Sequence, residues 1–255
     1  MVATRLLGLS FGPQAPNSST LVKPTSANFS VSEPLGASPA RTIVVATRNR
    51  HKTDEIRQIL GSRFHCLTLD DFPGVPPVKE GAATFAGNAT KKAVEIARWL
   101  KTSASPIGDG AFVLADDSGL EVEALNGAPG VYSARFAALD SSADGNTPDA
   151  DNNAKLLRLL KDVPKENRTA RFRCVIALLP VGSDSGDVTA TCFDGACEGR
   201  IDTAPRGTCG FGYDPLFVPT GFDRSFAELG EAEKNQISHR ARALAKLQAH
   251  WANLK

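Results

Sequence analysis

Near its middle, the chain reads Phe112-Val113-Leu114-Ala115-Asp116-Asp117-Ser118-Gly119-Leu120. The apolar run at its start predicts a buried strand, and the Ser-Gly pair predicts a turn directly after it. Two adjacent carboxylates would then lie at a strand end, where open α/β sheets place their ligands. Because like charges repel and desolvation adds to the cost, a hard divalent cation such as Mg²⁺ would stabilise the pair. A solvated acidic turn is the alternative, since Asp and Ser are common in turns.

The residues on either side supply the other elements of an α/β domain. Hydrophobic periodicity and capping signals predict one domain over residues 42–255, with a possible division into two lobes and without an internal repeat. Gly61 is expected to close the first helix, Gly195 to disturb the last strand, and Ser238 to cap the last helix. The predicted strands are 43–46, 112–115, 170–179 and 188–199, and the predicted helices are about 50–60, 85–101, 151–161 and 238–251.

Composition excludes several classes of protein. The 255 residues hold 29 Lys and Arg against 28 Asp and Glu, so a net charge of +1 gives no argument for a nucleic-acid or membrane partner. No apolar run approaches the ~18 residues that span a bilayer. The five cysteines are odd in number and form no CxxC pair. This pattern argues against a disulfide framework or a zinc site and favours free thiols in a reducing cytoplasm.

Residues 1–40 differ in composition from the rest. They are rich in Ser, Pro, Ala and Thr, with Glu33 as the only acid and Arg5 and Lys23 as the only basic residues. Such a segment buries too little apolar area to order itself, so we expect a disordered N-terminal extension. A transit peptide and an extension without function are both compatible with this composition.

A polar loop between the first strand and the first helix favours an anionic ligand. It reads Thr47-Arg48-Asn49-Arg50-His51-Lys52. A helix N-terminus presents free backbone N–H groups, which suit phosphate, and these side chains add donors and positive charge. The loop is neither a GxxxxGK[ST] nor a GxGxxG sequence, which disfavours a P-loop ATPase or a dinucleotide-binding protein. A capped helix with a solvated basic start is the alternative.

A glycine-rich loop later in the chain favours a planar ligand. It runs from Gly207 to Pro215, and Phe211 and Tyr213 offer faces on which a base could stack. Asp214 could accept hydrogen bonds from a base edge. The alternative is a hairpin turn whose aromatic side chains belong to the core.

Two further groups of charged residues extend the candidate site. His239 and Arg240 fall in the first turn of the last helix, where cations are unfavourable with the helix dipole, so an anionic or base ligand would justify them; a solvated basic turn is the alternative. Glu80, in a loop before the second helix, is a candidate third carboxylate for the metal. Asn88 and Lys92 stand four residues apart and therefore share one helix face.

Taken together and in order, these segments resemble the inosine/xanthosine triphosphate pyrophosphatase family. The resemblance covers about residues 42–251. It rests on Ala46-Thr47-x-Asn49-x-x-Lys52, Thr84-Phe85-x-x-Asn88-Ala89, Ala115-Asp116-Asp117-Ser118-Gly119-Leu120, Gly127-Ala128-Pro129-Gly130-Val131-Tyr132-Ser133-Ala134-Arg135, Phe211-Gly212-Tyr213-Asp214-Pro215 and Glu233-Lys234-x-x-x-Ser238-His239-Arg240.

The resemblance implies a mixed twisted sheet flanked by helices, two-lobed around a central substrate cleft. It implies a homodimeric, Mg²⁺-dependent enzyme that hydrolyses the α–β bond of ITP, dITP or XTP. Asp117 is the implied general base and a metal ligand, with Glu80 and Asp116 completing the metal site. The implied substrate-binding residues are Thr47, Arg48, Asn49, Arg50, His51, Lys52, Lys92, Ser118, Phe211, Gly212, Tyr213, Asp214, Lys234, His239 and Arg240.

Two residues depart from the family pattern. Arg48 stands where the phosphate loop usually has Gly, and Gly87 stands where a Glu commonly precedes the Asn-Ala pair. The first departure questions the loop's conformation, and the second makes Glu80 more important as a metal ligand. A pyrophosphatase for modified pyrimidine or methylated nucleotides, or a nucleotide-binding protein without catalysis, would share parts of this pattern.

Overall fold

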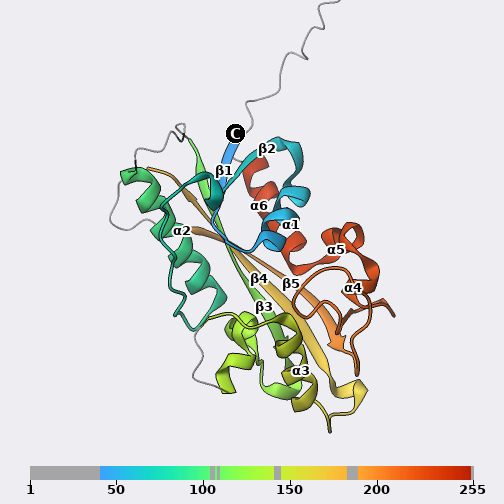
Figure 1. Ribbon diagram of the computed structural model, residues 1–255. Coiled ribbons are helices and arrows are strands. Elements are labelled where there is room, and N and C mark those ends of the chain that lie inside the picture. Colours follow the sequence, from blue (N-terminus) through green and yellow to red (C-terminus); the bar gives the residue numbers. More distant parts are fainter. Residues whose placement is uncertain (1–40, 104–106, 108–109, 141–144, 183–188, 254–255) are drawn as a thin grey trace, which may run out of the picture. The chain divides into compact units, whose positions relative to one another are not determined.

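The computed structural model describes residues 41–103, 107, 110–140, 145–182 and 189–253. Within them, one mixed sheet has the strand order β2-β1-β3-β4-β5-β6 (Figure 1). β1 is parallel to β2 and β3, whereas β3, β4, β5 and β6 are successively antiparallel. The expected mixed α/β sheet is confirmed. The strands are β1 (Arg41–Val45), β2 (Phe64–Thr68), β3 (Phe112–Val122), β4 (Thr169–Pro180), β5 (Thr191–Ile201) and β6 (Phe217–Pro219).

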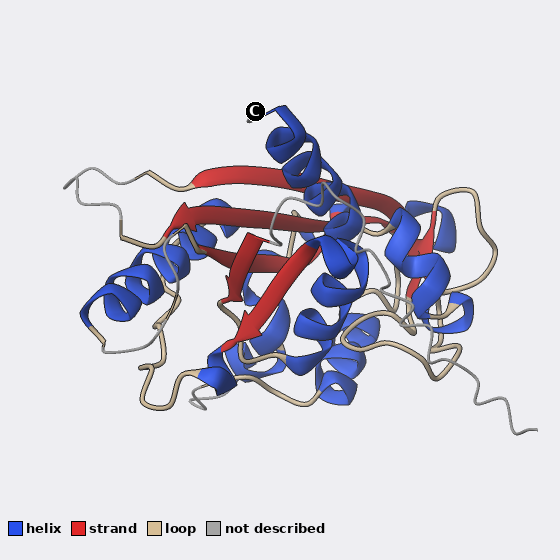
Figure 2. Cartoon of the chain, turned by 90° about the horizontal axis from the view of Figure 1, so that it is seen from above, coloured by secondary structure: helices blue, strands red, loops and turns tan. Residues whose placement is uncertain are grey.

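Helices cover both faces of this sheet (Figure 2). α2 buries Ala89, Ala93 and Ile96 against one face, in a cluster with alternate residues of β3 and β4. α1 and α6 pack on the other face, where Leu244 and Leu247 meet the opposite set of strand residues. The helices are α1 (Arg50–Leu60), α2 (Phe85–Thr102), α3 (Asp149–Leu159), α4 (Phe226–Leu229), α5 (Glu231–Ile237) and α6 (His239–Asn253).

A third apolar cluster surrounds the far half of the long strands. Leu120 of β3, Phe172 of β4 and Phe217 of β6 pack there with Leu156 of α3 and Phe226 of α4. The long antiparallel strands therefore extend past the end of β1 and carry a second set of helices, and the side chains of the site lie between the two sets.

The predicted helices and strands are all present, and all but β3 end within a few residues of their expected limits. Gly61 follows α1 with a φ of 64°, and the Ser238 hydroxyl accepts a hydrogen bond from the Ala241 amide, as expected of an N-cap. The sequence interpretation missed β2, β6, α4 and α5. These elements are short, and their residues show too few periods for the pattern to be recognised.

The position of the acidic pair corrects one expectation. Asp116 and Asp117 do not follow a strand, because β3 continues through them to Val122 and pairs with β4 over its whole length. The expected Ser-Gly turn is therefore wrong. β1, however, ends at Val45, opposite Leu114. The pair consequently lies just beyond the end of the parallel neighbour, inside the longer strand.

Gly195 causes no irregularity in β5, since it pairs in register with Cys174. Its role is close packing: a Cβ atom there would lie 2.1 Å from the carbonyl oxygen of His239 in α6. The five cysteines are free, consistent with the expected thiols. The expectation for residues 1–40 falls outside the described residues. Among the residues described, no helix is both long and apolar enough to cross a membrane.

Candidate active site

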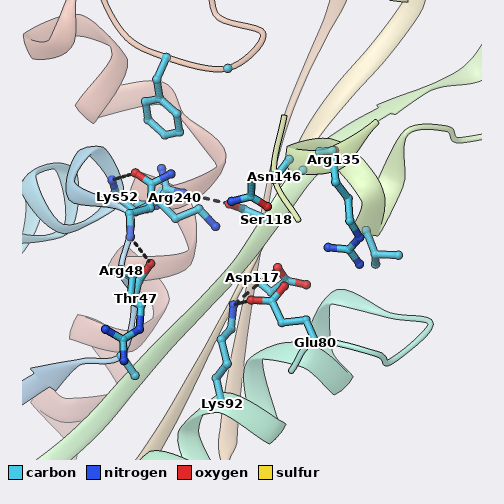
Figure 3. A pocket seen from close by; sticks show the side chains of 18 of the residues that line it. Thr47, Arg48, Lys52, Glu80, Lys92, Asp117, Ser118, Arg135, Asn146 and Arg240 are labelled. Atoms are coloured by element: carbon cyan, nitrogen blue, oxygen red, sulfur yellow. Dashed lines mark hydrogen bonds and ion pairs between the residues drawn. The ribbon is translucent and has the colours of Figure 1, made fainter. Parts of the chain in front are cut away.

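The predicted site residues converge on a pocket of about 400 Å³ between the two sets of helices (Figure 3). Its walls come from the loop after β1, from α2, from the middle of β3 and from the segment after β5 that leads to α6. Most of the expected residues line it: Thr47, Arg48, Asn49, Lys52, Glu80, Lys92, Asp117, Ser118, Phe211, Gly212, Tyr213, Asp214, Lys234, His239 and Arg240.

The two adjacent aspartates point to opposite faces of β3. Asp117 projects toward α2, where its Oδ2 accepts a hydrogen bond from Asn88. Asp116 projects toward α6, where it is 1% exposed and pairs with Arg240 and Lys52. This separation follows from the strand itself, because successive side chains alternate between faces. The carboxylates expected to share a cation are therefore apart, and Asp116 does not line the pocket.

Asp117 shares its surroundings with a second carboxylate and an ammonium group. The Nζ atom of Lys92 lies 2.8 Å from Oε1 of Glu80 and 3.7 Å from Oδ1 of Asp117 (Figure 3). Burial raises the pKa of Asp117 above its ordinary value and Glu80 adds to the rise, although Lys92 and Lys52 oppose it. Burial thus outweighs the nearby lysines in its effect on the pKa of Asp117.

The donor set of Asp117 and Glu80 fits a hard divalent cation. In the described part of the chain, no group of three or more His, Cys, Asp or Glu surrounds a common point. Mg²⁺ commonly takes only one or two protein carboxylates and fills its remaining positions with water and phosphate oxygens. Two carboxylates held by one lysine, beside a pocket for an anion, match that requirement.

The loop after β1 forms a basic wall of the pocket. The Asn49 side chain caps α1 by accepting a hydrogen bond from the Lys52 amide, and the Lys52 ammonium lies 2.6 Å from Asp116. Arg48, at the position where the family has Gly, donates to the Val75 carbonyl, 2.7 Å away. Its backbone has no positive φ, so the departure at Arg48 leaves the loop unstrained.

Two members of this loop do not line the pocket. Arg50 is exposed on the first turn of α1. His51 instead stacks on Phe211, with ring centroids 5.1 Å apart and an interplanar angle of 12°. His51 therefore lies against the predicted base wall and not along the predicted triphosphate.

Glu55 of α1 was missed by the sequence interpretation. It is buried and pairs with Lys234, 2.7 Å away, and with Arg240, joining α1 to α5 and α6. Burial alone would raise the pKa of Glu55, but the two cations lower it below its ordinary value. A signal was present, because Glu55 lies next to Ile56, on the apolar side of the helix, where a lone acid needs a partner.

These pairs also explain the cations at the start of α6. Arg240 is completely buried and is neutralised by Asp116 and Glu55, so no ligand is needed to justify its charge. His239 stacks on Phe172, with centroids 4.8 Å apart, and burial together with the neighbouring cations Arg240 and Lys234 holds its pKa well below the ordinary value. His239 is therefore neutral. Among the described residues, its buried Nδ1 atom has no hydrogen-bond partner.

The glycine-rich loop supplies the aromatic wall. The Lys234 ammonium lies 4.6 Å from the centroid of the Phe211 ring and 2.5 Å from Oδ2 of Asp214. Asp214 also accepts from the Phe211 amide. Asp214, which was expected to bind a base edge, thus orders the loop itself. Burial raises the pKa of Asp214, although Lys234 opposes the rise. Tyr213 is buried and donates to the Ser133 carbonyl.

Four further polar residues line the pocket without having been predicted for the site: Ser133, Arg135, Asn146 and Asp149. Arg135 belongs to the segment 127–135, which resembles the family, but no separate signal in the sequence indicated that its side chain faces a ligand.

The fold and the pocket define a mixed-sheet α/β protein with a cleft for an anionic ligand that carries an aromatic group. The basic loop after β1 lines one wall, the Asp117 carboxylate lies beside it with Glu80 and Lys92, and an aromatic wall that includes Phe211 and His239 completes the cleft. The family model described as the Ham1 family matches residues 43–250. The chain belongs to the Ham1 family.

Curated relatives and solved structures agree with this membership. The chain is 48% identical over 216 residues to a dITP/XTP pyrophosphatase of Geobacter sulfurreducens, covering 84% of this chain and 98% of the relative. A dITP/XTP pyrophosphatase of Geobacillus kaustophilus is 46% identical over 215 residues, covering 84% and 96%. The Ham1 protein of Staphylococcus aureus has a TM-score of 0.68 and 35% identity, covering 84% of this chain and 100% of that one.

Proposed function

We propose that this protein hydrolyses non-standard purine nucleoside triphosphates, ITP, dITP and XTP, to the monophosphate and pyrophosphate. The observation that carries the proposal is the arrangement around Asp117, with an anion-binding helix N-terminus on one side and an aromatic wall leading to His239 on another. The names of the curated relatives agree with this substrate class.

In the proposed reaction, water attacks the α-phosphorus and the bond to the oxygen bridging the α- and β-phosphates breaks. Asp117 accepts the proton of the attacking water, and the bridging oxygen leaves with the pyrophosphate. The backbone N–H groups at the start of α1, with Asn49 and Lys52, hold the phosphate chain. Lys92 offsets the charge that develops on the phosphate oxygens.

A divalent cation, Mg²⁺ by its preference for oxygen ligands, would be held by Asp117 and Glu80 in this proposal. When bound, it would supply charge neutralisation for the phosphate oxygens. Asp116 is reassigned from a metal ligand to the partner of Arg240 and Lys52, since its oxygens already bind those cations.

Selectivity for the base is proposed to come from His239. The donors of Lys234 and Arg240 are already engaged by carboxylates, whereas His239 lines the pocket and is held by stacking on Phe172. Its neutral imidazole would donate through a ring N–H to the 6-oxo group of hypoxanthine or xanthine. The 6-amino group of adenine would leave that donor unpaired, and a site built for one hydrogen-bonding group rejects the analogue lacking it strongly.

A substrate panel tests the function. The full chain is incubated with Mg²⁺ and ITP, dITP, XTP, ATP or GTP, and the products are identified. We expect pyrophosphate and the monophosphate from the first three. Orthophosphate with the diphosphate would contradict cleavage at the α–β bond, and equal turnover of ATP and ITP would contradict the base site. Tight ITP binding without product would support a nucleotide-binding protein.

The assembly and compartment are also proposals. We propose a homodimer, supported by the family resemblance and by the exposed apolar side chains of Tyr132, Leu139 and Leu159. The five free cysteines support a reducing compartment such as the cytoplasm. Size-exclusion chromatography with light scattering distinguishes a dimer from a monomer by its molar mass.

A further inference from the structure

Arg135 differs from the other cations that line the pocket. Lys52, Lys92, Lys234 and Arg240 each lie within ion-pair distance of a carboxylate, and Arg48 donates to a carbonyl. In the described residues, the guanidinium of Arg135 has neither a carboxylate partner nor a hydrogen bond. Its guanidinium makes a cation–π contact with the Tyr132 ring, whose centroid lies 5.2 Å from Cζ. A half-buried cation in an anion site is thus left without a counter-charge.

The backbone holds Arg135 firmly in this position. It ends a short 3₁₀ segment, Gly130–Arg135, in which the Ser133 hydroxyl donates to the Gly130 carbonyl and accepts from the Leu120 amide. On the next residue, the Ala134 carbonyl accepts from the Thr147 amide. Because these hydrogen bonds already order the backbone, little further conformational entropy of the backbone is lost when Arg135 binds a ligand.

Gly119 is the reason that this segment reaches the pocket. A Cβ atom on Gly119 would lie 2.4 Å from Ser133 Oγ and 2.5 Å from the Gly130 carbonyl oxygen. Because Gly119 has no side chain, the segment Gly130–Arg135 packs directly against β3 at this position, two residues after Asp117. Arg135 in this way lines the same pocket as Asp117.

The order of residues across the pocket indicates which part of the ligand Arg135 meets. Figure 3 draws Arg135 and Arg240 on opposite sides, with Ser118 and Asp117 between them. Arg240 adjoins His239, at the proposed base end. Lys52 lies on the Arg240 side, because both cations bind Asp116. A phosphate chain held at the start of α1, with its α-phosphate at Asp117, would therefore have Arg135 facing it from across the pocket.

We propose that Arg135 binds the β- and γ-phosphates of the substrate, the part that leaves as pyrophosphate. Guanidinium groups match the geometry of phosphate oxygens through paired N–H donors. The guanidinium lies over the Tyr132 ring, with Cζ 5.2 Å from the ring centroid. This inference rests on the proposed function for the identity of the substrate, but the binding of polyphosphate tests it separately.

The test compares the affinities of two probes, one inorganic and one a nucleotide, for the full chain without added metal. Calorimetry measures inorganic tripolyphosphate, which has only the phosphate chain, and inosine monophosphate, which lacks the outer phosphates. For Arg135→Gln, we expect the Kd for tripolyphosphate to rise about tenfold to hundredfold, the loss typical of a hydrogen bond to a charged group. The Kd for inosine monophosphate should stay within about twofold.

Two variants complete the design. Arg135→Lys should recover part of the tripolyphosphate affinity, because it keeps the charge but loses the paired donors. Arg98→Gln makes the same substitution as Arg135→Gln on an exposed arginine of α2 outside the pocket and should match the wild type. An unchanged tripolyphosphate Kd in Arg135→Gln, or an equal loss for both probes, would overturn the proposal. Absence of pyrophosphate release from dITP by the wild type would instead refute the proposed function.

Discussion

The ammonium group of Lys92 lies 2.8 Å from Glu80 and also contacts the main-chain oxygen of Asp116, at 2.7 Å. One lysine of α2 is thereby tied to the loop before its own helix and to the central strand. Lys92 is the nearest positive charge available to both carboxylates of the proposed metal site. Lys92 therefore holds Glu80 close to Asp117, where both carboxylates could bind the same ligand.

Asp117→Asn should remove activity while leaving the fold intact. The amide keeps the size of the side chain and its contact with Asn88, but it cannot accept the proton of water. We expect turnover of dITP to fall by at least about 10²-fold, the usual range for a lost general base. Pyrophosphate release measures activity and urea unfolding measures stability. Asp162→Asn, on an exposed residue, is the control. Activity retained in Asp117→Asn would remove Asp117 from this role.

Asp116→Asn should behave differently from its neighbour. Asp116 is the buried partner of both Arg240 and Lys52, and removing one member of a buried pair leaves a charge uncompensated. We expect a loss of about 3–5 kcal/mol in the free energy of unfolding, together with reduced activity. Urea titration of the two variants in parallel makes the comparison, and equal stabilities would contradict the opposite placement of the two side chains.

Glu55 should contribute to loss of stability in acid. Arg240 and Lys234 lower its pKa below the ordinary 4.5, so the folded chain releases this proton more readily than the unfolded chain does. The stabilisation is present above about pH 4.5 and is lost as the pH falls through the lowered folded-state value. Unfolding free energies measured in that range should fall with a shallower slope in Glu55→Gln. Identical slopes in variant and wild type would show that Glu55 does not titrate there. The other carboxylates whose pKa values are lowered, Asp71, Asp116, Asp140 and Asp202, contribute the remaining slope.

Phe211→Ala should weaken recognition of the base and not of the phosphates. The ring is the proposed stacking surface and already stacks on His51. Base stacking on an aromatic side chain is worth about 1–3 kcal/mol, so the Kd for inosine monophosphate should rise several-fold to about a hundredfold. Tripolyphosphate binding in the same variant is the internal control. This pattern is the reverse of that expected for Arg135→Gln, and a loss for both probes would indicate a disordered loop instead.

Gly119→Ala should displace the segment that carries Arg135. The added Cβ would lie within 2.5 Å of both Ser133 Oγ and the Gly130 carbonyl oxygen, which a tied backbone cannot relieve. We expect a loss of about 1–3 kcal/mol in unfolding free energy and weaker tripolyphosphate binding. Gly81→Ala is the matched control for stability, because a Cβ there meets no atom within 4 Å.

The sequence predicts the regular elements well and the charge partnerships poorly. Apolar periodicity located α2, β4 and α6 because each buries a continuous stripe. Fifteen of the predicted site residues line one pocket, since conspicuous polar loops follow the strands there. The partners of Asp116 could not be predicted, because they depend on which face of β3 each carboxylate takes. That choice follows from pairing with β4, a contact between distant parts of the chain.

The pairing of Glu55 with Arg240 joins residues 185 positions apart, and that of Asp116 with Arg240 joins residues 124 apart. α6 is synthesised after every other element of the sheet and its helices. Until it docks, the carboxylates of Glu55 in α1 and Asp116 in β3 lack the arginine that pairs with both of them. We therefore expect the site to become competent only after α6 has docked. A nucleotide that binds the docked site would then stabilise the folded chain against the undocked one.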